Sequence, residues 1–588
     1  MNKRNIFALL VLCLLGFQMQ ANAIENVVGD EPGLLNKQLQ QQIRDYEIEK
    51  KVIDTTEADI EKENKIRDKE KQQEEKDVVK GELTYNPKFL LKEVVFEGNT
   101  VYSDKRLKKL AKDLIGKEVY LDDIMNLTLK VSRYYQKNGY ITSFAYLDAQ
   151  EIKDGVVKIN IKESRITKKE CIGNKWERDR YLNNFVIGGH GLNYNNVFNA
   201  RALQGAMKNI NNSSYMNGSV AISRNENNDT EIKLNVQDRF PISLDMGWDD
   251  FGRNYTGRQR FTTVLGMDNL TGFGDRIYGG AILGQDSKGV LAGYEIPVGR
   301  WGTRLGFDFS HSTMDLGGPY RNYGIKGSSN DYILRLTQPI KNTATQDINL
   351  TVAFDWLNSK SDSEYLGPLS DYSLRVLRTR LNGMFDDRYG RTLVSLGFDL
   401  GIDGMGATES IGGVAESAFY KIIASLARVQ RLPKECLGIL RVNGQYSGQS
   451  LYPTEQMFLG GAYSLRGYQP SELLGDYGVA GSLEIRTPIP GIKAIFPKKY
   501  EDSWARKVRL VFFYDWGYVN CQNGNYDSPT NFLHSVGVGT NINITDAISF
   551  QIGIGFPLSK KMDENSGRLY FSINTELDKL FMKPKARL

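Results

Sequence analysis

The C-terminal part of the chain consists of segments in which apolar residues alternate with polar or small ones. In AISFQIGIGF the apolar side chains occupy every second position, at Ile548, Phe550, Ile552, Ile554 and Phe556. Because successive side chains of a β-strand point to opposite faces, this spacing places all five on one face. Such segments exclude a helical bundle and predict β-sheets with one apolar and one polar face.

The same alternation recurs from residue 240 to residue 577, for example in VSLGFDL at 394–400 and RLYFSINTEL at 568–577. An apolar outside with a polar inside is the signature of a transmembrane β-barrel. About 340 residues at roughly twenty per strand and turn predict about sixteen strands, and a barrel that wide has a lumen able to hold peptide. The alternative is a large soluble β-sandwich, which would bury one face in a core and usually carries fewer aromatic residues.

The N-terminus is typical of an export signal over residues 1–23. Lys3 and Arg4 precede an apolar run from Ile6 to Phe17, and Ala21 and Ala23 form a small-x-small cleavage site. A membrane anchor is the alternative, but the run is shorter than a spanning helix requires. The sequence therefore predicts that the protein leaves the cytoplasm.

Two regions are expected before the first folded domain. In residues 24–51 an otherwise polar helix carries one apolar stripe, which should dock against another surface. The stripe is formed by Leu35, Leu39, Ile43 and Tyr46. Residues 52–86 are rich in both charges and poor in large apolar groups, which predicts a solvated linker or, equally, a continuous charged helix.

Residues 87–164 and 165–239 have the texture of two tandem α+β modules. The first has a βααββ pattern, with a strand before Gly98, two amphipathic helices ending at Asn138-Gly139 and two further strands. The second is a less regular copy, with a helix at 200–210 and strands near 219–223 and 230–236. The predicted fold class is therefore mostly β: a barrel preceded by two α+β modules and an N-terminal helix.

Catalytic chemistry is poorly represented, so no enzyme activity, cofactor or metal site is expected. The three histidines are isolated in the sequence, at His190, His311 and His534. The expected mature chain retains Cys171, Cys436 and Cys521. Their spacing predicts no disulfide scaffold, although one disulfide remains open. The formal net charge of +5 is too close to balance to indicate nucleic acid as a partner.

The most informative residues form a loop motif and a strand motif some fifty positions apart. The loop motif is Leu465-Arg466-Gly467-Tyr468, and the strand motif contains Phe513, Asp515 and Gly517. Period-two geometry puts the latter three on one strand face, with Asp515 toward the lumen. Asp515 either faces water or receives Arg466 from a loop folded inward, in a charge-assisted contact that Gly467 would permit.

Both motifs resemble those of the outer-membrane assembly and translocation superfamily. Within it the chain most closely resembles the two-partner secretion transporters of the FhaC, ShlB and HecB type. The resemblance implies a plug helix, a linker, two polypeptide-transport-associated (POTRA) modules in the periplasm and a sixteen-stranded outer-membrane barrel. The chain departs from the pattern in Leu147-Asp148-Ala149-Gln150, which lacks a proline, and in a basic tail at 578–588.

By this resemblance the protein exports one unfolded, secreted partner protein, of haemolysin, adhesin or toxin type, without hydrolysing nucleotide. Its other partners would be outer-membrane lipid and, transiently, periplasmic chaperones and the barrel-assembly machinery. Three other functions are weighed against this one. A barrel-assembly factor would use the same loop and modules, a porin would leave the modules superfluous, and an outer-membrane hydrolase would need a catalytic set in the lumen.

Overall fold

The computed structural model describes the chain from the first α+β unit to the last barrel strand. The residues described are 86–211, 215–238, 241–298, 302–343, 345–409, 415–489, 507–523, 531–545, 547–559 and 567–577. The predicted export signal with Ala21 and Ala23, the predicted plug helix, the linker up to residue 85 and the basic tail lie outside them. In the part that is described, no helix is long and apolar enough to cross a membrane.

Sixteen antiparallel strands form a closed barrel, which confirms the predicted fold class and shows that the β-sandwich alternative is wrong. Each strand pairs with its sequence neighbour, except that β19 pairs with β22, and β26 closes the barrel on β9. The strands are β9 Ile242–Asp249, β10 Arg260–Asp268, β11 Arg276–Leu283, β12 Ser287–Pro297, β13 Arg304–Asp315, β14 Ile325–Asn342, β15 Gln346–Ser363, β16 Gly367–Asp386, β17 Gly390–Gly401, β18 Tyr420–Arg431, β19 Leu437–Ser447, β22 Tyr477–Pro488, β23 Val508–Asn520, β24 Phe532–Asn543, β25 Ile548–Pro557 and β26 Arg568–Glu576.

The alternation seen in the sequence sorts side chains between the two faces of the wall. In β17, Leu396, Phe398 and Leu400 are exposed on the outside, whereas Asp399 is fully buried on the inside. Exposed apolar residues on the outer face of a closed barrel are the expected surface for contact with lipid. The polar face therefore lines the lumen, and the charged side chains described below point into it.

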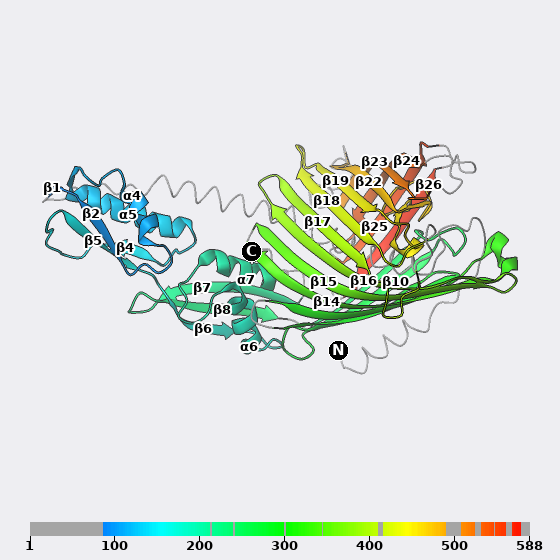
Figure 1. Ribbon diagram of the computed structural model, residues 1–588, viewed down its shortest axis with the longest axis horizontal. Coiled ribbons are helices and arrows are strands. Elements are labelled where there is room, and N and C mark those ends of the chain that lie inside the picture. Colours follow the sequence, from blue (N-terminus) through cyan, green and yellow to red (C-terminus); the bar gives the residue numbers. More distant parts are fainter. Residues whose placement is uncertain are drawn as a thin grey trace, which may run out of the picture.

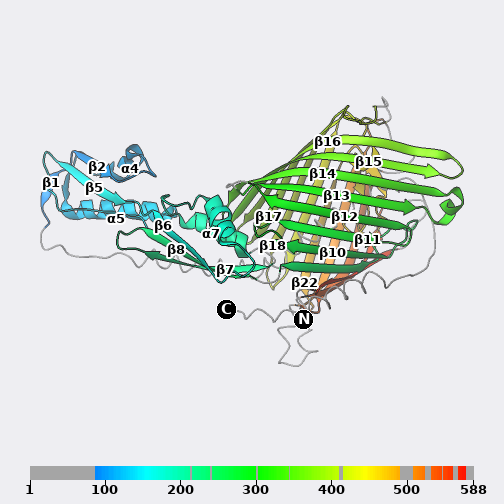
Figure 2. The same cartoon turned by 90° about the horizontal axis from the view of Figure 1, so that it is seen from below.

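The strands differ widely in length around the barrel. β14 and β15 have 18 residues each and β16 has 20, whereas β9 and β11 have 8. Figure 2 shows the long strands β14, β15 and β16 side by side along one edge of the wall. A membrane-spanning strand needs only about 9–11 residues, so the long strands extend beyond the bilayer.

The first α+β unit contains two helices packed on a small mixed sheet. Its elements are β1 Lys88–Leu90, β2 Glu93–Glu97, α4 Asp104–Ala111, β3 Glu118–Tyr120, α5 Leu121–Lys137, β4 Phe144–Tyr146 and β5 Val156–Lys162. The sheet order is β2-β5-β4, with β2 parallel to β5, and β1 and β3 form a separate pair. The βααββ order is as predicted, but the β1–β3 pair was not, because strands of three residues carry too little pattern.

The second α+β unit has a β6-β8-β7 sheet and a single regular helix. Its elements are β6 Ile166–Ile172, α6 Asp179–Tyr181, the π-helical turn η2 Leu182–Ile187, the 3-10 turn η3 Gly188–His190, α7 Ala200–Asn211, β7 Met216–Arg224 and β8 Thr230–Asp238. The first helix expected for a copy of the first unit is thus broken into three short turns. Two consecutive glycines, at 188 and 189, disfavour a continuous helix here.

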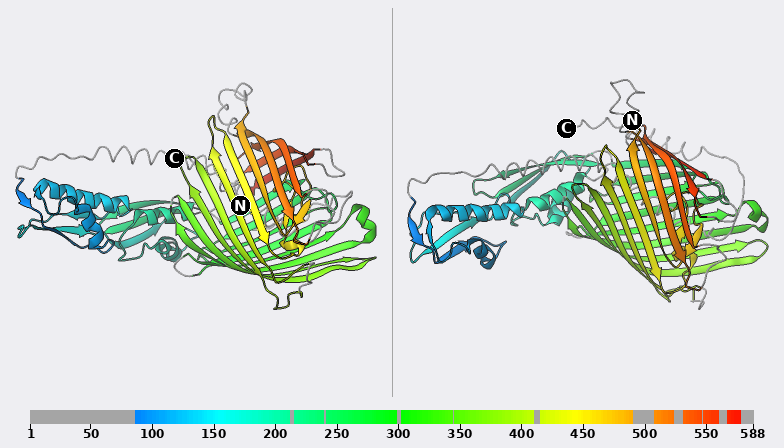
Figure 3. Two further views of the ribbon diagram at one scale, coloured as in Figure 1. Left: turned by 45° about the horizontal axis from the view of Figure 1, so that its top comes forward. Right: turned by 90° about the horizontal axis from the view of Figure 1, so that it is seen from above.

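The second unit is attached directly to one end of the barrel, with the first unit further out (Figures 1 and 3). Asn269, in the turn after β10, donates its side-chain amide to the carbonyl oxygen of Trp176 at 2.8 Å. Phe273, in the same turn, lies with its ring centre 4.7 Å from the guanidinium of Arg178. A β-carbon at Gly272 would lie 2.4 Å from Nε of Arg178, and the φ of +80° at this position favours glycine. The junction is therefore a packed interface in addition to a covalent link.

A buried carboxyl group makes the second unit sensitive to pH. The hydroxyl of Tyr215 donates to Glu177 at 2.6 Å, and Glu177 is only 4% exposed. Burial raises the pKa of Glu177 to about 7, from 4.5 for the free side chain. The folded unit therefore retains a proton that the unfolded chain has already lost, so the free energy of unfolding falls as the pH rises through this window.

We expect the unit to lose about 3 kcal/mol of stability between about pH 5 and about pH 8. The measurement is the urea midpoint of the full chain in detergent, followed by Trp176 fluorescence with a Trp176→Phe chain as blank. Glu177→Gln should remove most of the difference between the two pH values. A wild-type midpoint that stays level or rises with pH would contradict the expectation.

Candidate functional site: the loop inside the barrel

The connection between β19 and β22, residues 448–476, folds back into the lumen. It contains a 3-10 turn, Pro453–Glu455, and a short antiparallel pair, β20 Met457–Leu459 and β21 Leu473–Gly475. The loop motif of the sequence lies between the two short strands, at the turn of this hairpin. The fold therefore carries Leu465, Arg466, Gly467 and Tyr468 to the barrel wall at β22 to β26.

Arg466 reaches Asp515 on β23 with two parallel hydrogen bonds. Nε donates to Oδ2 of Asp515 at 2.8 Å, and Nη2 donates to Oδ1 at 2.9 Å. The backbone N–H of Arg466 also donates to Oδ2, at 3.0 Å. Asp515 is fully buried, so the desolvated carboxylate depends on these donors. Of the alternatives for Asp515, the structure has the ion pair and not a solvated carboxylate.

A second carboxylate completes the binding of the guanidinium. Nη1 of Arg466 donates to Oε2 of Glu484 on β22 at 2.6 Å, and Nη2 donates to Oγ of Ser482 at 3.1 Å. The guanidinium also lies over the Phe513 ring, with Cζ 3.6 Å from its centre. The planar guanidinium is thus bound at its edges by carboxylates and on one face by an aromatic ring, a combination that lysine cannot reproduce.

Gly467 allows the loop to approach the wall at backbone distance. Its φ of +104° lies in the region that favours glycine. Its N–H donates to the hydroxyl of Tyr570 on β26 at 2.7 Å, and that hydroxyl donates to the carbonyl oxygen of Tyr468 at 3.0 Å. The wall residue opposite is Gly555, where a β-carbon would lie 2.6 Å from the Gly467 nitrogen. Two glycines, one in the loop and one in β25, therefore face each other.

The remaining motif residues pack in a small apolar cluster beside the ion pairs. Leu465 is fully buried and Tyr468 is 4% exposed. A β-carbon at Gly517 would lie 3.0 Å from Leu465, so this strand glycine makes room for the loop. The Tyr468 hydroxyl donates to the carbonyl oxygen of His534 at 2.9 Å. Each residue of the strand motif, Phe513, Asp515 and Gly517, thus lies next to a residue of the loop motif.

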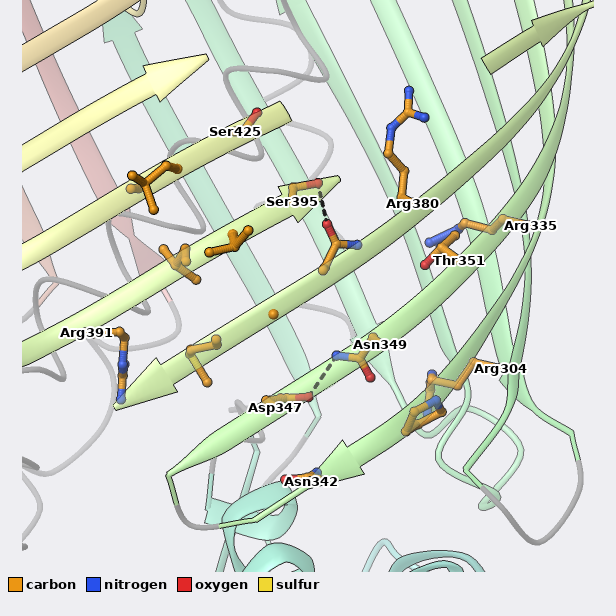
Figure 4. Close-up of a pocket in the computed structure, with 18 of the residues that line it drawn as sticks. Arg304, Arg335, Asn342, Asp347, Asn349, Thr351, Arg380, Arg391, Ser395 and Ser425 are labelled. Atoms are coloured by element: carbon orange, nitrogen blue, oxygen red, sulfur yellow. Dashed lines mark hydrogen bonds between the residues drawn. The ribbon is translucent and has the colours of Figure 1, made fainter. Parts of the chain in front are cut away.

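The loop lines a large cavity inside the barrel. The cavity has a volume of about 2820 Å³ and is lined by residues of the wall, of the loop and of the second α+β unit, including Arg466, Met207 and Ile222. Figure 4 shows part of its wall, where Arg335 and Arg380 point into the enclosed space. A continuous space from the second unit to the loop, lined by both polar and apolar side chains, is suited to an unfolded chain in transit.

The sequence did not identify four residues that contact the loop motif: Ser482, Glu484, Gly555 and Tyr570. The alternation signal was present for all four. Ser482 and Glu484 alternate with apolar residues in β22, and Gly555 and Tyr570 do so in β25 and β26, as lumen-facing residues do. The signal does not show which of them meet the loop, because that depends on the register of the strands and on the path of the loop.

Of the other residues singled out in the sequence, His534 and Cys521 adjoin the loop, with the Cys521 thiol 3.8 Å from the carbonyl oxygen of Leu474, and the rest lie apart from the motif contacts. His311 pairs with Asn330 through Nδ1 at 2.8 Å, and His190 pairs with the carbonyl oxygen of Val186 at 2.7 Å. Cys171, Cys436 and Cys521 are free thiols. Within the described ranges, no group of three or more His, Cys, Asp and Glu residues is arranged to hold a metal ion.

The barrel, the docked loop and the α+β units together define an outer-membrane β-barrel transporter. The family of haemolysin secretion/activation proteins ShlB/FhaC/HecB matches residues 228–542, more than half of the chain. The ShlB-type POTRA domain matches residues 89–164. The chain belongs to the ShlB/FhaC/HecB family. It is a two-partner secretion transporter of the outer membrane with POTRA modules in the periplasm, which confirms the resemblance found in the sequence.

Individual relatives agree with this assignment. The heme/hemopexin transporter protein HuxB of Haemophilus influenzae is 24% identical over 476 residues, which cover 78% of this chain and 81% of the relative. The outer membrane transporter CdiB of Dickeya dadantii is 25% identical over 414 residues, covering 67% of this chain and 71% of the relative. Both relatives are transporters, and transporters are not in general enzymes.

Solved structures share the fold. CdiB from Escherichia coli aligns with a TM-score of 0.75 at 19% identity, over 94% of this chain and all of that chain. CdiB from Acinetobacter baumannii aligns with a TM-score of 0.66 at 17% identity, over 88% of this chain and 98% of that chain. The likeness therefore covers the barrel together with the modules that precede it.

Proposed function

We propose that the protein exports one dedicated partner protein, in unfolded form, from the periplasm to the cell surface. The observation that carries the proposal is the single cavity that joins the second module to the docked Arg466 loop. A partner of haemolysin, adhesin or toxin type would enter at the module side and leave at the opposite rim. No nucleotide would be hydrolysed, and folding of the emerging chain outside the cell would drive export.

Recognition of the partner is assigned to the modules at 87–164 and 165–239. Each of the two three-stranded sheets ends in edge strands, β2 and β4 in the first and β6 and β7 in the second. An extended peptide can add a strand to such an edge through backbone hydrogen bonds, which require little sequence specificity. This mode suits an unfolded chain, since it needs no prior structure in the partner.

The expected helix at 24–51, with Leu35, Leu39, Ile43 and Tyr46, would close the pore at rest and leave it during export. The linker at 52–86 would give this helix the reach it needs. The loop motif would then rearrange or guide the passing chain. Periplasmic chaperones would deliver the partner, the barrel-assembly machinery would insert the barrel at 240–577, and lipid would surround it.

The test compares cells with and without the protein. We expect the deletion to remove one large protein from the culture medium, by more than about tenfold, and to leave the outer-membrane protein profile unchanged, because each transporter of this type serves its own partner. Mass spectrometry of both fractions measures this. A general fall in barrel proteins would instead assign the protein to barrel assembly. No change in either fraction would indicate that the protein is a porin.

A further inference from the structure

The loop has a second charged anchor, eleven positions before Arg466, which the motif does not include. Glu455 ends the 3-10 turn of the loop, and its side chain is fully buried in the lumen. Oε1 accepts from Nη2 of Arg378 at 2.9 Å, and Oε2 accepts from Nζ of Lys421 at 2.6 Å. The same ammonium group donates to the carbonyl oxygen of Glu455 at 3.0 Å. Both the backbone and the side chain of this loop residue are thus fixed to the wall.

The wall around Glu455 carries its own ion pairs on β15 to β18. Arg378 donates through Nε to Asp355 at 2.8 Å and through Nη1 to Asp399 at 2.9 Å. Arg380 donates through Nη2 to the same Asp399 at 2.8 Å. Among these directly bonded groups, the wall supplies three cations and two carboxylates. The wall alone therefore has one positive charge in excess, and the carboxylate of the loop neutralises it.

The other anchor has the opposite polarity. The wall there offers two carboxylates, Asp515 and Glu484, and one directly bonded cation, Arg486, whose Nε donates to Glu484 at 2.6 Å. The loop supplies the missing positive charge with Arg466. One stretch of loop thus presents a carboxylate to β16 and β18 and a guanidinium to β22 and β23. Opposite charges at the two ends define which part of the loop meets which part of the wall.

We propose that Glu455 is a positioning residue that holds the first half of the loop across the lumen, independently of Arg466. The proposal rests on the proposed function. The loop is held by two charged contacts, that of Glu455 and that of Arg466. If one contact opens, the other keeps the loop close to the wall, so the opened contact can form again without the loop diffusing away. Release of the Glu455 side chain leaves the segment before β20 on its uncharged contacts, the stacking of Tyr452 on Tyr372 and the hydrogen bond from Gln445 to the Glu455 carbonyl oxygen. The weakened segment can then move and widen the pore, while the loop tip stays on β22 and β23.

The test is the conductance of the purified full-length protein in planar lipid bilayers, with no partner protein present. Glu455→Gln keeps the shape of the side chain but removes its charge. We expect the fraction of time spent in the open state to rise about tenfold or more, because loss of one partner weakens a buried ion pair strongly. Asp308→Asn is the matched control. Asp308 is a lumen-facing carboxylate bound by Nε of Arg335 at 2.8 Å on the wall, and its variant should conduct like the wild type.

A double variant separates anchoring from general stability of the wall. Glu455→Gln with Lys421→Met leaves two cations and two carboxylates, so the buried charge is balanced again without the anchor. If Glu455 positions the loop, the double variant conducts as freely as the single variant. If Glu455 only balances the charge of the wall, the double variant returns to wild-type conductance and the proposal is wrong. The double variant also provides the test if the single variant fails to assemble.

Wild-type conductance of Glu455→Gln, in a barrel shown to be assembled by its heat-modifiable migration in gels, would also overturn the proposal. These results do not depend on any exported protein. Failure of the proposed function would instead appear as an unchanged culture medium after deletion of the protein, so the two failures are distinguishable.

Discussion

Arg466→Ala abolishes export of the partner protein while the barrel still reaches the outer membrane; this is the largest effect we expect. The substitution leaves Asp515 and Glu484 buried without their shared cation. Breaking a buried ion pair in this way costs about 3–5 kcal/mol. Such a loss shifts the equilibrium between docked and undocked loop by more than about 100-fold. The measurement is the amount of partner in the medium, divided by the amount of folded barrel.

Two further variants sharpen this prediction. Arg466→Lys keeps the charge but cannot form the two parallel bonds to Asp515, so we expect partial export. Arg428→Ala is the matched control, since Arg428 on β18 pairs with Asp387 near the start of β17 and is 22% exposed. It should export normally. Normal export by a fully assembled Arg466→Ala barrel would rule out a role for the docked loop.

Gly555→Ala should also strongly reduce export, although it adds only one methyl group. The new carbon would lie 2.6 Å from the backbone nitrogen of Gly467 and 2.8 Å from the carbonyl carbon of Arg466. Because both are backbone atoms, the loop tip must move, and the hydrogen bond from Gly467 to Tyr570 is lost. That loss costs about 1–3 kcal/mol, which is about tenfold or more in the docking equilibrium.

The readout for Gly555→Ala is trypsin added to intact cells. Arg466 is protected in the docked loop, so cleavage after this residue should appear only in the variant. Gly553→Ala is the control, because Gly553 lies two positions away on the same face of β25, and its β-carbon would meet only β24, at 3.2 Å. Equal protection of the loop in both variants would show that the contact between Gly467 and Gly555 does not hold the loop in place.

Much of the fold could be predicted from the sequence, because a barrel wall is a local pattern repeated many times. The alternation within the ten or so residues of a single strand, such as β25, is enough to predict which side chains lie on each face. The number of strands followed from the length of the patterned region. The unequal strand lengths could not be predicted, since alternation does not show where β14 or β16 leaves the membrane. The broken first helix of the second module was not predicted either, although the consecutive glycines at 188 and 189 that disfavour a continuous helix are present in the sequence.

Only part of the candidate site could be predicted from the sequence, for a related reason. Arg466 and Asp515 stand out because each belongs to a short motif with a recognisable spacing. Glu455 and Arg378 stand 77 positions apart and belong to no motif. Their contact depends on where a long loop turns after it enters the lumen, which local patterning does not encode. The charge balance between the loop and the wall is apparent only in the structure, where the charged side chains of both lie side by side.

The unequal strands also bear on the membrane around the protein. A strand of 8 residues, such as β9 or β11, is about 27 Å long, and when tilted by about 40° it rises only about 21 Å along the bilayer normal. A typical hydrocarbon core is about 30 Å thick, so lipid next to these strands must thin to match them. The strands β14 to β16, further round the barrel, impose no such demand. The barrel therefore sits in a bilayer of uneven thickness, compressed on the side where β9 meets β26 and relaxed on the side of the long strands.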